Sequence, residues 1–466
     1  MHTERSIAQF DPELIARYDT QGPRYTSYPT APQFHDGFGE RQLRDAARAS
    51  NEEPIPRELS LYVHLPFCFS PCFYCGCTRI ITHDLGKADI YLDALQREAE
   101  LIAPLFDPDR EVVQLHFGGG TPNFLDRGRM RRLLGVLENH FTLSRSPRRE
   151  FGIEIDPRYA SPEYVKDLGS LGLNRMSIGI QDFDPQVQEA VNRVQSVAQV
   201  EDIMRAGRES GFGSISVDLI YGLPHQDVER FTRTLDQVIE LAPDRIAAYS
   251  YAHMPQLFKA QRQIQDSVLP DATTKLALFG RTLERLTEAG YVYIGMDHFA
   301  RADDDLARAQ EAGTLQRNFQ GYSTYGDCDI IGLGVSAIGR IGETYSQNAR
   351  ELKAYYAALD AGRIPVIRGI HLGADDLIRR ELIGELMCHG RLDKKAFGHR
   401  HRLDFDRYFV HDMKRLAPLA DDGLVEVDAN QLQITPRGRL LIRHVAMCFD
   451  AYLQQDSSGH GFSKAI

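Results

Sequence analysis

Four of the seven cysteines lie within ten residues of one another, at positions 68, 72, 75 and 77. The first three follow the spacing C-x3-C-x2-C, which lets three thiolates from one short irregular loop converge on a single compact inorganic centre. A 4Fe-4S cluster fits this pattern best, because three protein ligands leave one of the four irons open to a small molecule. The sequence therefore predicts a cluster held by Cys68, Cys72 and Cys75, and the open iron indicates catalysis.

Structural zinc, a redox disulfide and buried free thiols are the competing interpretations of this quartet. Zinc usually takes two pairs of ligands well apart in sequence, and no second Cys/His pair with that spacing follows. A redox pair of Cys75 and Cys77 leaves Cys68 and Cys72 without a role. The cysteines outside the quartet are scattered, and we expect them to be buried small side chains: Cys328, Cys388 and Cys448.

Length and charge limit the class of protein. The 466 residues suffice for one barrel-sized domain and one or two smaller ones. No apolar run reaches the roughly twenty residues that span a bilayer, and the first residues lack the apolar core of a secretory signal. With clustered thiols, which favour a reducing compartment, this predicts a cytoplasmic protein without a membrane span. The formal net charge of −11 disfavours nucleic acid as a partner, because phosphate binding needs a basic surface.

Short apolar runs alternate with amphipathic stretches from residue 59 onward. The predicted strands cover residues 59–64, 112–117, 151–155, 175–180, 215–220 and 245–251. The predicted helices between and after them include residues 87–103, 127–139, 162–171, 228–241 and 273–289. Strands and helices that alternate at this spacing predict a parallel sheet. About six such units are typical of an open or closed β/α barrel, whose site lies at the carboxyl ends of the strands.

Residues suited to chemistry follow these predicted strands. The cysteine loop follows the first, a glycine run at 118–120 follows the second, and Glu154 ends the third. Gln181 follows the fourth strand, Asp218 lies in the fifth, and Ala252 follows the sixth. Parallel strands bring their carboxyl ends to one edge, so these residues are expected to converge there. The glycine run by itself is equally consistent with a tight turn.

The cysteine spacing, with the aromatic Tyr74 before the third cysteine, resembles the radical S-adenosylmethionine (radical SAM) superfamily. Cys77 and matches along nearly the whole chain narrow the resemblance to the oxygen-independent coproporphyrinogen III oxidases, also called coproporphyrinogen dehydrogenases. The resemblance implies an α/β fold, an incomplete (β/α)6 TIM-like barrel with an N-terminal extension and a mainly helical C-terminal domain. It also implies that SAM chelates the open iron and is cleaved by an electron from the cluster to a 5′-deoxyadenosyl radical.

The same resemblance implies two SAM molecules per chain. The one on the cluster is surrounded by positions that match Tyr62, Gly119, Glu154 and Ile338. The second is held by positions that match Tyr74, Gly120, Thr121, Gln181, Arg193, Asp218 and Ala252. A structural ion pair is the alternative interpretation of Arg193 and Asp218.

The implied reaction converts two propionates of coproporphyrinogen III to vinyl groups, giving protoporphyrinogen IX in heme biosynthesis. Arg24, Arg301 and Arg317 are candidates for holding the propionates, because guanidinium groups bind carboxylates well. His298 is a candidate for orienting substrate or moving a proton. The implied partners are coproporphyrinogen III, a flavodoxin-type electron donor and a final electron acceptor that the sequence does not specify, and a monomer is expected.

We expect three parts: an N-terminal extension near the active site (1–58), the partial barrel with associated elements (59–350) and a mainly helical C-terminal domain with a small hairpin (351–466). Proline and glycine in the first part argue against a long helix there. The hairpin is predicted at 424–427 and 432–435. Alternative functions are a related enzyme acting on another tetrapyrrole, a heme-binding chaperone and, least well supported, an iron-sulfur electron carrier.

Overall fold

The structure is a computed structural model and describes residues 8–455. These residues form two compact units. The first unit comprises residues 8–33, 276–326 and 372–455, and the second comprises Phe34–Lys275 and Asp327–His371. No helix in the described part of the chain is long and apolar enough to cross a membrane.

The second unit is built on a run of parallel strands that follow one another in the chain. They are β1 (Leu59–Leu65), β4 (Glu111–Gly119), β6 (Glu150–Ile155), β7 (Arg175–Gln181), β8 (Ser214–Tyr221) and β9 (Arg245–Ser250). They pair in this order, each with the next. All six coincide with predicted strands to within two residues at either end.

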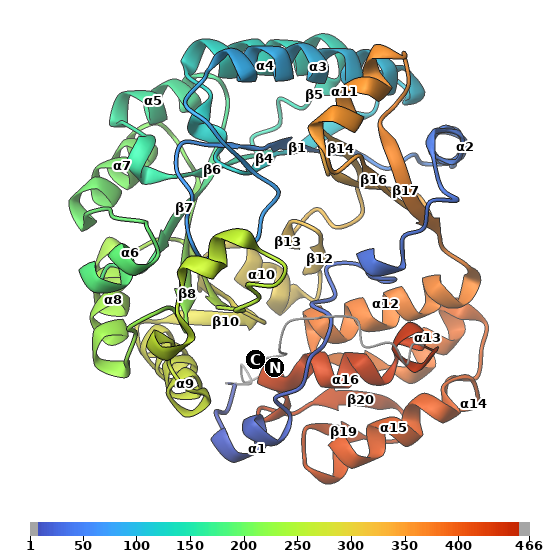
Figure 1. Ribbon diagram of the computed structural model, residues 1–466. Coiled ribbons are helices and arrows are strands. Elements are labelled where there is room, and N and C mark those ends of the chain that lie inside the picture. Colours follow the sequence, from blue (N-terminus) through green and yellow to red (C-terminus); the bar gives the residue numbers. More distant parts are fainter. Residues whose placement is uncertain (1–7, 456–466) are drawn as a thin grey trace. The chain divides into compact units, whose positions relative to one another are not determined.

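Helices connect these strands and lie outside them in Figure 1. They are α3 (Gly86–Ile102), α4 (Arg127–His140), α5 (Pro162–Ser170), α6 (Pro185–Ala190), α7 (Val197–Glu209) and α8 (Val228–Leu241). Helix α8 illustrates the local cause: the Asp227 side chain accepts from the amide of Arg230 and caps the helix, and apolar side chains spaced three or four apart are buried on one face. Those buried side chains include Phe231, Leu235 and Val238.

The sheet continues beyond β1 with strands that the sequence did not predict. Strand β1 pairs in parallel with β14 (Asp329–Leu333), so it lies between β4 and β14 and the parallel run is not closed into a ring. Antiparallel strands β15 (Ile338–Ile341), β16 (Thr344–Asn348) and β17 (Val366–His371) follow. Gly332 shows why these strands were not predicted. A Cβ at this position of β14 would lie 2.7 Å from the carbonyl oxygen of Ile338, so the pairing of β14 with β15 requires a glycine, a residue that is uncommon inside strands.

The first unit combines small hairpins with helices. Strand β10 (Tyr291–Gly295) pairs with β11 (His298–Arg301), and β12 (Gln316–Asn318) pairs with β13 (Gly321–Ser323). Its longest helices are α12 (Ala374–His389) and α15 (Val410–Asp421), apart from the part of α9 (Ala272–Glu288) that belongs to it. The expected hairpin is present as β19 (Val425–Val427) and β20 (Gln431–Ile434), and β18 (Arg391–Asp393) adds a third strand to it.

The expectation against a long helix in residues 1–58 is wrong. Helix α2 (Glu40–Asn51) forms in a stretch that is itself free of proline and glycine. It buries Leu43, Ala47 and Ser50 on one face, and the Gln42 side chain accepts from the amide of Gly39 at its start. A shorter helix, α1 (Pro12–Arg17), begins at a proline, which suits the first helical position.

Candidate active site

The cysteine loop is closed at its base by two short parallel strands. Strand β2 (Phe67–Cys68) follows directly on β1 and pairs with β3 (Ile80–Ile81). The side chain of Arg79 turns back into the loop and donates to the carbonyl oxygens of Cys75 and Cys72. Cys68 and Cys72 are buried, Cys75 is half-buried and Cys77 is exposed.

Hydrogen-bond donors from distant parts of the second unit lie at the sulfurs. The Thr121 hydroxyl donates to Cys68 Sγ at 3.3 Å. Cys72 Sγ accepts from Nη2 of Arg158 at 3.4 Å and from Nη1 of Arg193 at 3.5 Å. A thiolate is a better acceptor than a thiol, so this donor set suits sulfurs that carry negative charge.

The environment of the cysteines separates their acidities. Burial raises the pKa of the Cys68 thiol to about 11. Hydrogen bonding by Cys77, whose amide donates to Cys75 Sγ at 3.4 Å, lowers the pKa of Cys75 to about 6 despite burial. The side-chain hydrogen bond with Cys75 raises the pKa of Cys77. The pKa shifts of these two neighbouring cysteines are therefore opposite in direction.

The chemistry of this donor set fits an iron-sulfur cluster, since thiolates are the usual protein ligands of such clusters. Within residues 8–455 no three His, Cys, Asp or Glu side chains surround a point suited to one metal ion. The loop does supply three thiols, each with a hydrogen-bond donor at its sulfur, which is the donor set that a 4Fe-4S cluster with one open iron takes.

The glycine run at the end of β4 is required by close approach, not only by a turn. A Cβ on Gly118 would lie 2.8 Å from Oε1 of Glu154, and one on Gly120 would lie 2.7 Å from the backbone of Pro66. Gly119 has φ +115°, and its Cβ would lie 2.5 Å from the His64 ring. The missing side chains therefore let the end of β4 approach Glu154, His64 and the start of the cysteine loop closely.

Glu154, near the end of β6, is held by two groups of the neighbouring strand β4. The amide of Gly119 donates to its Oε2 at 3.2 Å, and Nε2 of His116 lies 3.3 Å from its Oε1. Burial alone raises the pKa of Glu154, but His116 and the Gly119 amide outweigh it and lower that pKa. The Tyr62 ring stacks on the His116 ring with centroids 6.0 Å apart, and its hydroxyl lies 3.2 Å from Nδ1 of His64.

Arg193 is buried and forms an ion pair with Asp156, with 3.1 Å between Nη1 and Oδ2. Its other nitrogens donate to the carbonyl of Gly179. Asp218 accepts instead from the Ser177 hydroxyl at 3.1 Å. Burial and the nearby charge of Glu154 raise the pKa of Asp218 to about 7.

The remaining residues expected around SAM also lie in the second unit. Tyr74 packs against an apolar cluster that includes Val187 and Leu223. Gln261 donates to the carbonyls of both Tyr74 and Ala252, which ties the cysteine loop to the end of β9. Gln181 ends β7 with φ +68°, and Ile338 begins β15.

Three of the four residues expected to handle substrate come together in the first unit. Arg24 forms an ion pair with Asp297, in the turn between β10 and β11. The guanidinium of Arg317 lies over the Tyr322 ring, 4.7 Å from its centroid, and its Nη2 lies 3.4 Å from the carbonyl oxygen of Arg24. The His298 ring meets the same tyrosine edge-on at 5.4 Å.

The fourth residue and the N-terminal tyrosines lie elsewhere within that unit. Arg301 ends β11, is half-exposed and pairs with Asp303. Tyr25 and Tyr28 are buried: Tyr25 donates to the Asp450 carboxylate, and the Tyr28 hydroxyl accepts from the amide of Ala451. Their hydroxyls therefore anchor the N-terminal segment to the last described helical turn of the chain.

Sequence reasoning missed several groups at the cysteine loop. Arg158, Arg79 and His116 were not predicted, because arginines and histidines without a motif are usually surface or packing residues. Asp156, which follows the third predicted strand, had no predicted role either. Its position two residues after Glu154 was the available signal, since both lie at the carboxyl end of β6.

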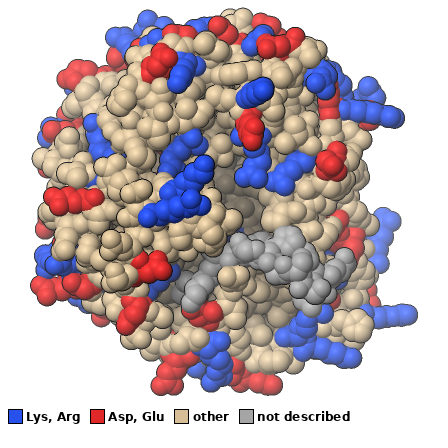
Figure 2. Space-filling model, viewed as in Figure 1, with Lys and Arg blue, Asp and Glu red and all other residues tan. Residues whose placement is uncertain are grey.

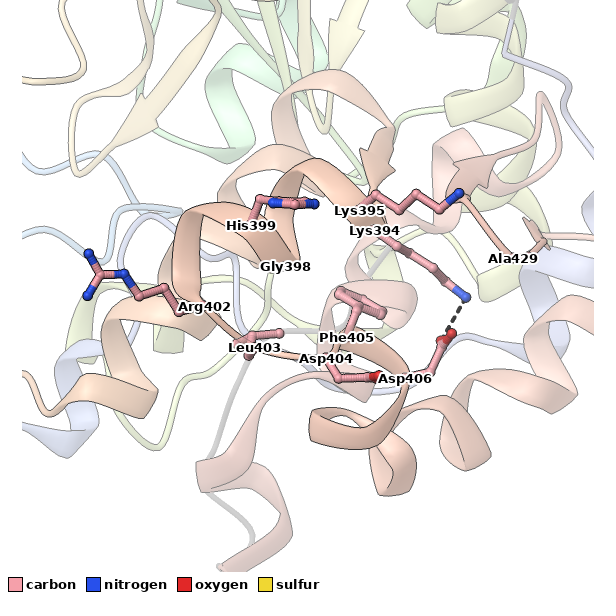
Figure 3. A pocket seen from close by; sticks show the side chains of 10 residues that line it. All are labelled: Lys394, Lys395, Gly398, His399, Arg402, Leu403, Asp404, Phe405, Asp406 and Ala429. Atoms are coloured by element: carbon pink, nitrogen blue, oxygen red, sulfur yellow. Dashed lines mark hydrogen bonds and ion pairs between the residues drawn. The ribbon is translucent and has the colours of Figure 1, made fainter.

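A separate cavity of about 480 Å3 lies in the first unit, along α13 (Lys394–His401) and α14 (Phe405–Tyr408) (Figure 3). Its buried cation, Lys394, is engaged by the Asp406 carboxylate and the Asp428 carbonyl. None of the predicted site residues lines it. Figure 2 shows basic and acidic side chains interspersed over the visible face, with several basic ones near the middle of the view.

A strand-end site with a three-thiol loop, on this α/β sheet, defines a protein of the radical SAM class. The family model of the radical SAM superfamily matches residues 62–238, and the model of the HemN C-terminal domain matches residues 372–441. The chain belongs to the oxygen-independent coproporphyrinogen III oxidase family, because it is 44–48% identical over nearly its whole length to relatives of that name.

Relatives with that name are similar over their whole length. The chain is 48% identical to the oxygen-independent coproporphyrinogen III oxidase of Escherichia coli, covering 99% of this chain and 100% of the relative. It is 44% identical to that of Synechocystis, covering 100% of both chains. The solved structure of coproporphyrinogen III oxidase (HemN) from Escherichia coli, described as a radical SAM enzyme, matches with a TM-score of 0.91 at 48% identity, covering 96% of this chain and 99% of that one.

Proposed function

We propose that this chain catalyses the oxidative decarboxylation of two propionate side chains of coproporphyrinogen III to vinyl groups, which gives protoporphyrinogen IX in heme biosynthesis. The observation that carries this proposal is the full-length similarity to enzymes of that name, at 48% identity over 463 residues. The cysteine loop with its glycine cradle supports it independently, because it supplies the ligands that this chemistry requires.

Cys68, Cys72 and Cys75 are the residues that would hold a 4Fe-4S cluster. Tyr62, Gly119, Glu154 and Ile338 are proposed to surround the SAM molecule on its open iron. When bound, the cluster and SAM supply the radical that removes a hydrogen atom from the propionate. The Glu154 carboxylate, held by His116 and the Gly119 amide, is placed to accept hydrogen bonds from hydroxyl or ammonium groups of SAM.

A second SAM molecule is proposed to bind at Tyr74, Gly120, Thr121, Gln181, Arg193, Asp218 and Ala252. Asp218 supports this, because its carboxylate accepts from the Ser177 hydroxyl and retains capacity for an ammonium donor. Arg193 contributes positive charge near this carboxylate, which counteracts the rise of the Asp218 pKa. Gly120 and Thr121 lie directly behind the cysteine loop, since their amides donate to the carbonyls of Leu65 and Phe67.

Substrate carboxylates are proposed to meet Arg24, Arg301 and Arg317, with His298 as a residue that orients substrate or moves a proton. Arg317 supports this most directly. Its Nε and Nη1 are buried without a hydrogen-bond partner among the described residues, so two donors of a cation are left for an anionic ligand.

We also propose that strands β1 to β9 and their helices form an incomplete (β/α)6 TIM-like barrel. In this division residues 59–350 are the barrel part, residues 1–58 are an N-terminal extension near the active site, and residues 351–466 are the C-terminal domain. The enzyme is expected to act as a cytoplasmic monomer with a flavodoxin-type electron donor and a separate final electron acceptor.

The proposal is tested by reconstituting the protein with iron and sulfide under anaerobic conditions and adding coproporphyrinogen III, SAM and a reductant. Vinyl-bearing product supports the proposal. Tight heme binding without any conversion of the substrate would instead favour a heme-binding chaperone.

A further inference from the structure

Arg158 has an unusual position beside the cysteine loop. It follows β6 in the short turn η4 (Pro157–Tyr159). Its side chain folds back and donates to both carboxylate oxygens of Asp156, from Nε to Oδ1 at 3.0 Å and from Nη2 to Oδ2 at 2.7 Å. Its Nη1 donates to the carbonyl of Asn192 at 3.1 Å. The side chain is only 11% exposed. Held in this way, Nη2 also reaches Cys72 Sγ at 3.4 Å.

The charges around Cys72 do not cancel. Asp156 is the shared counter-ion of two guanidinium groups, Arg158 and Arg193, and both of them donate to the Cys72 sulfur. Two positive charges and one negative charge therefore lie beside this ligand. The Asp156 and Arg193 side chains are each 6% exposed, so water screens the excess positive charge weakly.

Hydrogen bonds to cluster sulfurs and nearby positive charge stabilise the more reduced, more negative state of an iron-sulfur centre. We infer that Arg158 raises the reduction potential of the cluster through its hydrogen bond and charge at Cys72. Arg158 acts as a positioning and tuning residue, because it touches a ligand of the cluster and not the substrate. The inference rests on the proposed function, since it requires a cluster on Cys68, Cys72 and Cys75.

The test measures the reduction potential of the reconstituted cluster, without SAM, by anaerobic titration with dithionite and redox mediators, followed by electron paramagnetic resonance. Arg158→Gln removes the charge. At a fixed applied potential the ratio of reduced to oxidised cluster should fall about tenfold, which is about 59 mV for a one-electron couple. Arg158→Lys keeps the charge but shortens the donor, and its potential should lie between those of the unmutated protein and Arg158→Gln.

Arg208→Gln is the matched control. Arg208 also pairs with an aspartate, Asp244, but that residue directly precedes β9, at the opposite end of the strands from the cysteine loop. Its replacement removes one positive charge from the same unit and should leave the potential unchanged. An equal fall in both glutamine variants would overturn the inference, because the effect would then reflect net charge alone.

Iron and sulfide content separates this inference from the proposal on which it rests. Absence of a cluster from the unmutated protein would overturn both. With a normal cluster present, equal potentials in the unmutated protein and Arg158→Gln would overturn this inference alone. If Arg158→Gln fails to hold a cluster, Arg158→Lys decides: a lowered potential supports the inference, and an unchanged one overturns it.

Discussion

Arg193 forms its ion pair with Asp156, at 3.1 Å between Nη1 and Oδ2, whereas Asp218 accepts from the Ser177 hydroxyl. Arg193 and Asp218 therefore do not hold each other in place as a structural ion pair. Arg193 is fixed by Asp156 and by the Gly179 carbonyl, so its charge is placed independently of Asp218. The positive charge of Arg193 nevertheless acts on the Asp218 carboxylate, because it counteracts the rise of the Asp218 pKa. A cation and a carboxylate that are not paired with each other are suited to a zwitterionic ligand.

We predict that Asp218→Asn keeps the cluster but lowers the number of bound SAM molecules from two to one, because a neutral amide attracts an ammonium group less. Equilibrium dialysis of labelled SAM against reconstituted protein counts the sites. Arg193→Ala should also lose the second molecule, but it removes a partner from buried Asp156 and should lower the melting temperature as well. One bound SAM in the unmutated protein would contradict the second site.

The cysteines should separate into two classes. Serine at position 68, 72 or 75 should abolish cluster assembly, because each substitution removes one of only three protein ligands. Serine at position 77 should leave iron and sulfide content unchanged, since Cys77 is exposed and its amide, which serine retains, is the group that donates to Cys75 Sγ. Iron and sulfide analysis with visible absorption, after anaerobic reconstitution, distinguishes the classes. A full cluster in Cys72→Ser would refute the ligand assignment.

Gly119→Ala should weaken SAM binding strongly. Its backbone has φ +115° and its Cβ would lie 2.5 Å from the His64 ring, so the cradle must shift. Gly135→Ala is the control, because position 135 lies inside α4, where an added Cβ would meet no atom within 4 Å, and alanine there should stabilise the helix by about 0.5–1 kcal/mol. SAM titration and thermal unfolding measure the two effects. Similar SAM affinity in both variants would remove the glycine run from the site.

Glu98 is a buried carboxyl group whose titration should affect stability. It is 0% exposed in α3 and accepts from the amide of Gly334 and from the side chains of Asn348 and Tyr355. These bonds fix the loop after β14, next to the end of β1. Burial nevertheless raises the pKa of Glu98 to about 7, from an ordinary value of 4.5.

Because the folded state binds this proton more tightly than the unfolded state, the stabilising contribution of Glu98 is complete below pH 4.5 and is lost as the pH rises through 7. Relative to Glu98→Gln, the unmutated protein should lose about 2 kcal/mol between pH 5 and 7.5. Urea unfolding followed by circular dichroism tests this, since the chain has no tryptophan. A difference between the two proteins that is independent of pH would contradict the prediction.

The parallel half of the fold was predictable because it repeats one pattern. Buried strands of six to nine residues, each followed by an amphipathic helix, have periodicities that a sequence displays directly. The strands β14 to β17 were missed, because glycines such as Gly332 and short polar strands show no such period. Helix α2 was missed because the prolines and glycines around it obscure a helical stretch that contains neither.

The candidate site also has a part that could be predicted from the sequence and a part that could not. The cysteines and the glycine run could be predicted, because their residues have a recognisable spacing along the chain. The arginine contacts at Cys72 depend on loops that follow β6 and α6, and only the folded chain brings Arg158 and Arg193 to one sulfur. Spacing along the sequence cannot reveal such a contact.

The most direct test of the whole account is product analysis under strictly anaerobic conditions, with the unmutated protein and Cys72→Ser compared side by side. Each receives coproporphyrinogen III, SAM and a reductant, and the products are separated by chromatography and mass spectrometry. The account predicts protoporphyrinogen IX, with loss of two carboxyl groups as carbon dioxide, from the unmutated protein only. Absence of vinyl product from a cluster-loaded unmutated protein, or equal conversion by Cys72→Ser, would contradict it.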